Sequence, residues 1–323
     1  MSQSLTFLEP VAAELHEVES RMRHVPLAAH PTLLAALQHI LASGGKRVRP
    51  ALTLLVGQAL SGPTERLIDL AAAVEMLHTA SLVHDDIIDG SLMRRGAATL
   101  NATWSPGATI LTGDFIFARA AQLAAATQSV RVMSLFAETL MVICNGELRQ
   151  LFEGRAGERV RPAYYERIYA KTGSLFALAS EAAAVLSTTD ETLIAQMRDL
   201  GKHLGMAFQI VDDILDFAGE ESAVGKPVGS DLRQGLVTLP TLCFLERYPA
   251  DGRVLDVLDG HRRDPERLER AIQAIRTSEA MALSLDEARL FTNKARATLE
   301  HLPAGQSRQA LSDLAGYLVE RVV

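Results

Sequence analysis

Apolar residues recur every three to four positions along most of the chain, which is the spacing of an amphipathic α-helix. Residues 67–77 and 200–215 are two clear examples. Short groups of Gly, Pro, Ser and Asp separate these segments and are typical of turns. Asp190 lies where a helix N-cap is expected, and the spacing predicts a helix from there to about Phe217. At about 1.5 Å per residue this helix would be about 40 Å long, which indicates a helical bundle.

The segment from Gly219 to Gly235 breaks this pattern, because it holds four glycines in seventeen residues. Long loops in compact domains are usually functional or disordered. We therefore expect a mobile loop near a site, and a simple exposed connection is the alternative.

The composition agrees with an all-α fold. Aromatic residues make up 5% of the 323 residues, and β-branched runs are few. Sandwiches and barrels depend on both kinds of residue. No Ser/Pro/Gly-rich linker or low-complexity tract divides the chain. We expect a single domain over residues 1–323.

The charge and cysteine content exclude several classes of protein. The 32 basic and 39 acidic residues give a formal net charge of −7, which argues against a general nucleic-acid binder. Cys144 and Cys243 cannot form a disulfide framework or a four-thiolate metal site, so a reducing compartment is expected. We find no export signal and no run of about eighteen consecutive apolar residues. The expectation is a cytoplasmic protein without a transmembrane segment.

Two acidic motifs share one spacing. Asp-Asp-x-x-Asp occurs at residues 85–89, the first Asp motif, and again at residues 212–216, the second Asp motif. In each, the first and third Asp lie on one helical face, where like charges repel unless a cation is present. Carboxylate oxygens suit Mg²⁺, which takes one or two of them and completes its shell with water or phosphate. A solvated acidic face would explain one motif, but two copies within apolar segments favour metal binding.

Basic residues cluster near the first Asp motif. The segment 44–50, GGKRVRP, places three cations in a flexible turn just before a predicted helix, and Arg94-Arg95-Gly96 follows the motif. Such a turn can bind an anion through free backbone amides and the helix dipole. Alone, the basic run is equally compatible with a solvated surface. Together with two metal-binding motifs, it indicates a site for diphosphates.

The helix through the first Asp motif also presents an uncharged face. Ser81, His78 and Val74 lie within about 40° of Asp85 around the helix axis. Val74 would lie about 16 Å from Asp85 along the axis, which leaves room for a long apolar chain. Ordinary helix packing is the alternative.

At these motifs the chain resembles the trans-polyprenyl diphosphate synthases. The resemblance covers residues 44 to 240 and rests on GGKRVRP, HTASLVHDDIIDGSLMRRG, NGELRQ, KTGSLFA, and QIVDDILDF with GKPVGSDL. It implies an all-α bundle around a deep central cavity, usually a homodimer, with the two Asp motifs facing each other across the mouth. It also implies head-to-tail condensation of isopentenyl diphosphate with an allylic diphosphate through ionisation, condensation and proton loss.

The resemblance assigns a role to each matching residue. Mg²⁺ would be held by Asp85, Asp89 and Asp212, with Asp86, Asp213 and Asp216 completing the motifs. Isopentenyl diphosphate would be bound by Lys46, Arg49, His78 and Arg95. The allylic diphosphate would be bound by Arg94, Lys171, Thr172, Gln209 and Lys226. The six Asp residues form the expected catalytic set together with Lys171 and Lys226. Glu147 and Gln150 would organise water or neighbouring helices.

The resemblance also bears on product length. Short-chain members commonly carry a bulky aromatic residue four or five positions before the first Asp, where this chain has Ser81 and Ala80. Many bacterial short-chain enzymes have four residues, not two, between the Asp pair and the third Asp. We therefore expect a long product, in the range of quinone side-chain precursors, with Phe136 or Leu77 as the tunnel floor. A geranylgeranyl or farnesyl product is the alternative.

Two departures from the family pattern stand out. Some relatives have Lys where this chain has Leu236, so one diphosphate contact is expected to be absent. The C-terminal residues 318–323 lack the basic ending of some short-chain relatives. The rival functions are a class I terpene cyclase, against which the intact second Asp motif argues, and a non-catalytic partner subunit, against which the six retained carboxylates argue.

Overall fold

The computed structural model describes residues 6–25, 29–42, 44–94, 96–152, 159–218, 228–261 and 264–321. Two predicted site residues, Arg95 and Lys226, lie outside these ranges. Residues 219–227 of the predicted loop also lie outside them. The other predicted site residues lie inside.

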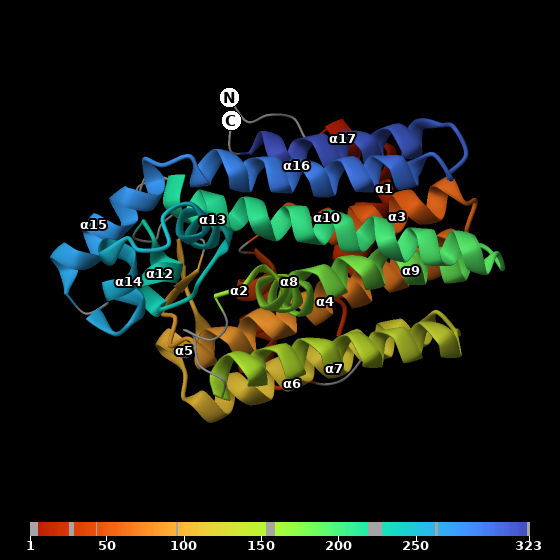
Figure 1. The fold of residues 1–323 in the computed structure, drawn as a ribbon. Helices are drawn as coiled ribbons and strands as arrows, with labels where there is room; N and C mark the ends of the chain where they lie inside the picture. The colour runs from red at the N-terminus through yellow and green to blue at the C-terminus, as the bar shows by residue number, and fades with distance from the viewer. Residues whose placement is uncertain are drawn as a thin grey trace. The chain divides into compact units, whose positions relative to one another are not determined.

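The described residues are mostly helical (Figure 1). The first part of the chain forms a 3₁₀ turn η1 (Thr6–Val11), α1 (Ala12–Arg23), α2 (Pro31–Ala42), α3 (Val48–Ala59), α4 (Thr64–Ile88), strands β1 (Met93–Arg94) and β2 (Ala97–Ala98), α5 (Leu100–Thr103), α6 (Pro106–Ala126) and α7 (Val130–Phe152). The second part forms α8 (Arg161–Ile168), a π-helical turn η2 (Tyr169–Gly173), α9 (Ser174–Ser187), α10 (Glu191–Ala218), α12 (Ser230–Gln234), α13 (Leu239–Arg247), α14 (Gly252–Leu258), α15 (Pro265–Arg276), α16 (Ala280–Leu299) and α17 (Gln306–Glu320). The two strands pair antiparallel, with Met93 opposite Ala98 and Arg94 opposite Ala97. The all-α prediction is confirmed.

Helix α10 agrees closely with its prediction. It runs from Glu191 to Ala218, one residue beyond the predicted end. The Asp190 side chain accepts hydrogen bonds from the backbone amides of Thr192 and Leu193 at 2.9 and 3.2 Å. Asp190 therefore caps the helix as the sequence indicates.

The chain forms two compact units. Unit 1 comprises Met1–Thr139, Leu175–Gly201 and Leu299–Asp313. Unit 2 comprises Leu140–Ser174, Lys202–Thr298 and Leu314–Val323. The first Asp motif belongs to unit 1 and the second to unit 2. The single domain over residues 1–323 stays a prediction.

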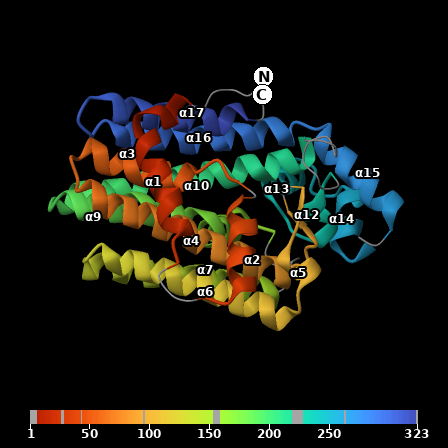
Figure 2. The same cartoon turned by 180° about the vertical axis from the view of Figure 1, so that it is seen from behind.

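Helix α4 is the centre of unit 1, where it packs along α6, α3 and α1 (Figures 1 and 2). A Cβ atom on Gly57 of α3 would collide with Leu67, and one on Gly113 of α6 would collide with His84. The two glycines therefore allow the neighbouring helices to approach α4. Residues 70–77 are all buried, which explains why α4 is apolar on most of its faces.

Among the described residues, α4 is also the helix that is long and apolar enough to cross a membrane. In the structure, however, 72% of its most apolar 18-residue window is buried by the protein itself. Core helices have the same composition, so length and hydropathy alone do not distinguish the two cases.

Unit 2 has its own hydrophobic core, formed by side chains of α8, α10 and α12 to α16. Tyr164 and Phe217 are among its largest buried side chains. Arg161, at the start of α8, binds Glu246 of α13 at 2.7 Å and Glu287 of α16 at 3.2 Å. These contacts hold α8 in place, and α8 carries Tyr164 to the second Asp motif.

Candidate active site

The first Asp motif lies at the C-terminal end of α4, and its middle residue is the buried one. Asp86 is 7% exposed, whereas Asp85 is half-buried and Asp89 is exposed. Nε and Nη2 of Arg94, on strand β1, donate to Oδ1 of Asp86 at 3.0 and 2.8 Å. Nδ2 of Asn101 donates to the Asp86 carbonyl at 3.2 Å. Asp86 thus ties the hairpin and α5 to α4, while its two neighbours in the motif are more accessible.

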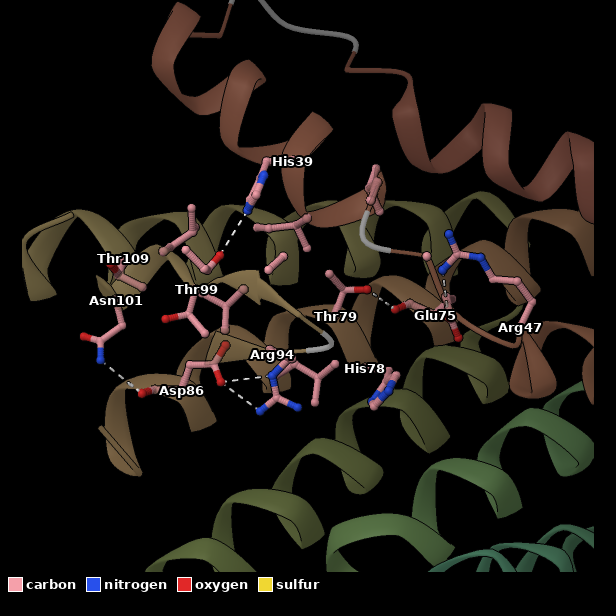
Figure 3. Close-up of a pocket in the computed structure, with 18 residues that line it drawn as sticks. His39, Arg47, Glu75, His78, Thr79, Asp86, Arg94, Thr99, Asn101 and Thr109 are labelled. Carbon is pink, nitrogen blue, oxygen red and sulfur yellow. Dashed lines mark hydrogen bonds and ion pairs between the residues drawn. The ribbon is translucent and has the colours of Figure 1, made fainter. Parts of the chain in front are cut away.

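A pocket that is open to solvent lies beside this motif in unit 1 (Figure 3). It brings together three of the predicted residues, His78, Asp86 and Arg94, with Arg47 and Glu75. Its walls come from α2, the turn before α3, α4, the hairpin and α5. Both signs of charge meet in this pocket, so an anionic group with its counter-cation could bind there.

Arg47 and Glu75 form an ion pair that the sequence analysis did not predict. Nη1 of Arg47 donates to Glu75 Oε1 at 3.0 Å, and its Nε donates to Glu19 Oε1 at 3.3 Å. Arg47 has a left-handed backbone with φ of 49°, which is unfavourable for a residue with a Cβ atom. The pair fixes the turn 44–50 against α4. The adjacent Lys46 is exposed, and Arg49 is buried with its guanidinium 4.8 Å from the Phe176 ring centroid.

The residues predicted to set product length are mostly buried in unit 1. Leu77, Ala80 and Phe136 are each no more than 2% exposed. Ser81 is half-buried, and its hydroxyl donates to the His78 carbonyl at 2.8 Å. The pocket in Figure 3 is lined by His78 and Thr79 and not by these four residues. Their roles as wall and floor of a tunnel stay predictions.

The second Asp motif also buries its middle residue. Asp213 is 3% exposed and accepts hydrogen bonds from Tyr164 Oη at 2.8 Å and from Gln209 Nε2 at 2.9 Å. Burial raises the pKa of Asp213 to about 8, and nearby Asp231 contributes to the rise, while the two hydrogen bonds and Arg167 oppose it. A divalent cation at the motif would favour the carboxylate form and lower this pKa. The sequence carried no signal for the role of Tyr164.

The two outer residues of the second Asp motif have different partners. Oδ1 and Oδ2 of Asp216 accept hydrogen bonds from the backbone amides of Ser230 and Asp231, both at 3.1 Å. Asp212 is half-buried, and its Oδ1 accepts a hydrogen bond from Arg321 Nη2 at 2.7 Å. Asp216 therefore holds the start of α12 on α10, and Asp212 has an arginine partner that the sequence analysis missed.

Two predicted allylic-site residues, Thr172 and Gln209, are linked to this motif in unit 2. Thr172 Oγ1 donates to Gln209 Oε1 at 2.7 Å, and Gln209 in turn donates to Asp213. Lys171 Nζ lies 3.9 Å from Oε1 of Glu147. Lys171 and Thr172 lie in the π-helical turn η2, and such turns are frequent at functional sites. A continuous hydrogen-bonded path thus runs from η2 to the second Asp motif.

The donor sets of both motifs are compatible with Mg²⁺. Within the described ranges, no three His, Cys, Asp or Glu side chains converge on one point. Mg²⁺ does not need such a cage, because it usually binds one or two carboxylates and takes the rest of its octahedral shell from water and phosphate. Asp85 and Asp89, one helical turn apart and accessible, meet this requirement in unit 1. That the two motifs face each other stays a prediction.

Comparisons with known proteins agree with these observations. The profile of the polyprenyl synthetase family matches residues 30–275. A prenyl transferase of Synechocystis sp. is 35% identical over 325 residues and spans 100% of both chains. The crystal structure of heptaprenyl diphosphate synthase from Staphylococcus aureus is 34% identical, covers 97% of this chain and 99% of its own, and has a TM-score of 0.91.

A further solved structure carries ligands. The polyprenyl synthase from Caulobacter crescentus, complexed with calcium and isoprenyl diphosphate, is 36% identical and has a TM-score of 0.88, covering 100% of this chain and 99% of its own. The family match spans most of the chain, and the relatives share its full length. The chain therefore belongs to the polyprenyl synthetase family and is a prenyltransferase.

Proposed function

We propose that the protein condenses isopentenyl diphosphate with an allylic diphosphate, in the presence of Mg²⁺, to make a long-chain all-trans polyprenyl diphosphate. The observation that carries this proposal is the arrangement common to both Asp motifs. In each, the middle Asp is buried and bonded within its own unit, and the outer Asp residues are more accessible. This arrangement supports Asp85, Asp89 and Asp212 as the proposed metal ligands.

The basic and polar residues would bind the two diphosphates. Lys46, Arg49 and His78 are proposed to bind isopentenyl diphosphate, and Arg94, Lys171, Thr172 and Gln209 to bind the allylic diphosphate. Arg95 and Lys226 keep these roles as proposals from the family resemblance. Because Arg94 is bonded to Asp86, its guanidinium is held beside the first Asp motif, where fixed cations stabilise a diphosphate better than mobile ones.

The reaction follows from this placement. The allylic C–O bond breaks, and its electron pair leaves with the diphosphate. The metal ions would neutralise the charge that develops on that leaving group. The alkene of isopentenyl diphosphate then adds to the allylic cation, and loss of a proton restores an alkene. Apolar side chains of α4 would protect the cation from water.

A long product is proposed on two grounds. Ala80 and Ser81 stand where short-chain members carry aromatic residues, and the solved heptaprenyl diphosphate synthase from S. aureus is similar over almost the whole chain. A precursor of a quinone side chain fits this length. Phe136 or Leu77 is proposed as the floor of the tunnel that accommodates this long product. A shorter product would instead require a block elsewhere in the tunnel.

We further propose a cytoplasmic homodimer. Several apolar side chains are exposed on α6 and α7, including Leu111 at 70%, Met141 at 63% and Phe152 at 83%. A second copy of the chain could cover these side chains, because homodimer interfaces are rich in apolar residues. Sedimentation velocity at micromolar concentration tests this, with a monomer as the contradicting result.

The main experiment is incubation of the purified protein with isopentenyl diphosphate, farnesyl or geranylgeranyl diphosphate, and Mg²⁺, followed by mass analysis of the products. The proposal expects products extended by several five-carbon units, and EDTA should abolish them. Products limited to 20 carbons would support the short-chain alternative. Absence of elongation with every primer and with Mg²⁺ and Mn²⁺ would overturn the proposal.

A further inference from the structure

Arg321, directly after α17, makes a contact that none of the predicted roles explains. Its Nη2 donates to Asp212 Oδ1 at 2.7 Å, and its guanidinium carbon lies 4.9 Å from the ring centroid of Phe208. The Arg321 side chain is only 15% exposed. All three residues belong to unit 2.

The position of Arg321 follows from the geometry of α10. Phe208 and Asp212 are four residues apart, so they lie one above the other on the same helical face. The aromatic ring supports the flat guanidinium, and the carboxylate fixes its rotation. Gln209 and Asp213 occupy the adjoining strip of α10 and lead to Thr172. Arg321 therefore lies beside the residues proposed to bind the allylic diphosphate.

One donor of Arg321 is unused. Its Nη1 is buried and has no hydrogen-bond partner in the part of the chain that the structure describes. Buried donors are nearly always hydrogen-bonded in proteins. The guanidinium is held by Asp212 and Phe208, and the two N–H bonds of Nη1 have no acceptor among the described residues. Charged N–H donors of this kind bind the oxygens of phosphate groups.

We propose that Arg321 is a further diphosphate-binding residue, whose Nη1 donates to a diphosphate oxygen held at the second Asp motif. The inference rests on the proposed function, because that function supplies the diphosphate. Residues 318–323 lack the basic ending of some short-chain relatives, but their one arginine contacts the second Asp motif. The rival role is that of a counter-ion for Asp212, which would compete with a metal ion and contribute nothing to diphosphate binding.

Titration calorimetry on the full-length protein separates these roles, with Mg²⁺ and inorganic pyrophosphate as the probe. Arg321→Met keeps an apolar chain against Phe208 but removes the charge and all donors. The proposal expects its pyrophosphate affinity to fall roughly tenfold to hundredfold, as for loss of a charge-assisted hydrogen bond. Arg289→Met is the matched control, because it removes an exposed arginine that pairs with Asp286 at 3.0 Å in the same unit, and its affinity should be unchanged.

The source of the diphosphate is resolved by two further titrations, one with a non-ionising thiolo analogue of farnesyl diphosphate and one with isopentenyl diphosphate. If Arg321→Met loses affinity for the farnesyl analogue, Arg321 binds the allylic substrate. If it loses affinity for isopentenyl diphosphate, Arg321 binds that substrate. Unchanged affinity for all three probes, together with tighter Mn²⁺ binding measured by electron paramagnetic resonance, would overturn the proposal in favour of the counter-ion.

Two checks keep the result interpretable. If Arg321→Met loses its cooperative melting transition, Arg321→Lys replaces it, and a several-fold weaker pyrophosphate affinity is then expected because lysine cannot present two fixed donors. Failure of the proposed function has a different signature: the unaltered protein would bind magnesium pyrophosphate without elongating any primer. Normal elongation by the unaltered protein with full affinity in both variants would refute the Arg321 role alone.

Discussion

The two Asp motifs have the same spacing but are stabilised in different ways. In unit 1 the buried Asp86 has a charged partner, Arg94, at 2.8 Å. In unit 2 the buried Asp213 has two neutral partners, Tyr164 and Gln209. A charged partner lets a buried carboxylate keep its charge, whereas neutral donors compensate only part of the loss of hydration. Identical spacing therefore does not mean identical electrostatics.

The third residues of the motifs differ as well. Asp89 directly follows α4 and is exposed, whereas both oxygens of Asp216 accept hydrogen bonds from backbone amides at the start of α12. The first residues, Asp85 and Asp212, are both half-buried. The comparison thus predicts that equivalent substitutions will agree at the first position and diverge at the second and third.

The largest effect is expected at the first position of each motif. Asp85→Asn and Asp212→Asn should each lower kcat roughly 10²–10³-fold, because each removes a carboxylate that is proposed to hold Mg²⁺ against the leaving diphosphate. Steady-state rates over a range of Mg²⁺ concentrations measure this, with Asp286→Asn, an exposed acid paired to Arg289, as the control. If either variant keeps a near-normal kcat, the residue it replaces is not a metal ligand.

The middle position should break the symmetry. Asp86→Asn leaves Arg94 without its counter-charge, and because Arg94 is partly exposed, the free energy of unfolding should fall by only about 1 kcal/mol. The KM for the allylic diphosphate should rise, since Arg94 loses its anchor. Asp213→Asn keeps partners for Tyr164 and Gln209 and should be tolerated better. Urea unfolding measures the free energy of unfolding of the two variants, and initial rates measure their KM. Equal changes in Asp86→Asn and Asp213→Asn would contradict the comparison.

A pH series sharpens the same contrast. Without metal, the pKa of Asp213 in the folded protein lies well above its usual range, mainly because of burial. The folded state then holds a proton that the unfolded chain releases. The contribution of this proton to the free energy of unfolding is therefore complete below the ordinary pKa of an Asp side chain and is lost as the pH rises toward 8. In melting curves recorded in EDTA, the Tm of Asp213→Asn relative to that of the unaltered protein should rise between pH 5 and 8. A constant difference across this range would contradict the raised pKa.

Sequence reasoning located the motifs but could not distinguish their surroundings. The helical periodicity predicted α10 and the N-cap at Asp190, because both depend on local spacing. The partners of the buried Asp residues come from distant segments: Tyr164 is 49 positions from Asp213, and Arg321 is 109 positions from Asp212. No local pattern encodes pairs that are so far apart in the sequence.

A smaller effect is expected from the ion pair that fixes the basic turn of unit 1. Glu75→Gln should raise the KM for isopentenyl diphosphate roughly three- to tenfold, equivalent to about 0.7–1.4 kcal/mol, with kcat within about twofold, since Lys46 and Arg49 lose orientation but not charge. Glu19→Gln is the matched control, because it removes the longer and more exposed contact to Arg47. If both variants raise KM equally, or if kcat falls instead, Arg47 has another role.

The smallest effect is expected at the third position of the second motif. Asp216→Asn keeps one acceptor for the amides of Ser230 and Asp231, so the free energy of unfolding should fall by about 0.5–1 kcal/mol, as for a weakened helix cap. Its kcat should fall less than that of Asp89→Asn, the equivalent change in the first motif, because Asp216 acts through the start of α12 and Asp89 is proposed to bind metal. Chemical denaturation and parallel Mg²⁺ titrations measure both quantities. If Asp216→Asn instead required much more Mg²⁺ for half-maximal rate, Asp216 would have to be a metal ligand, and its backbone contacts would belong to the metal-free state alone.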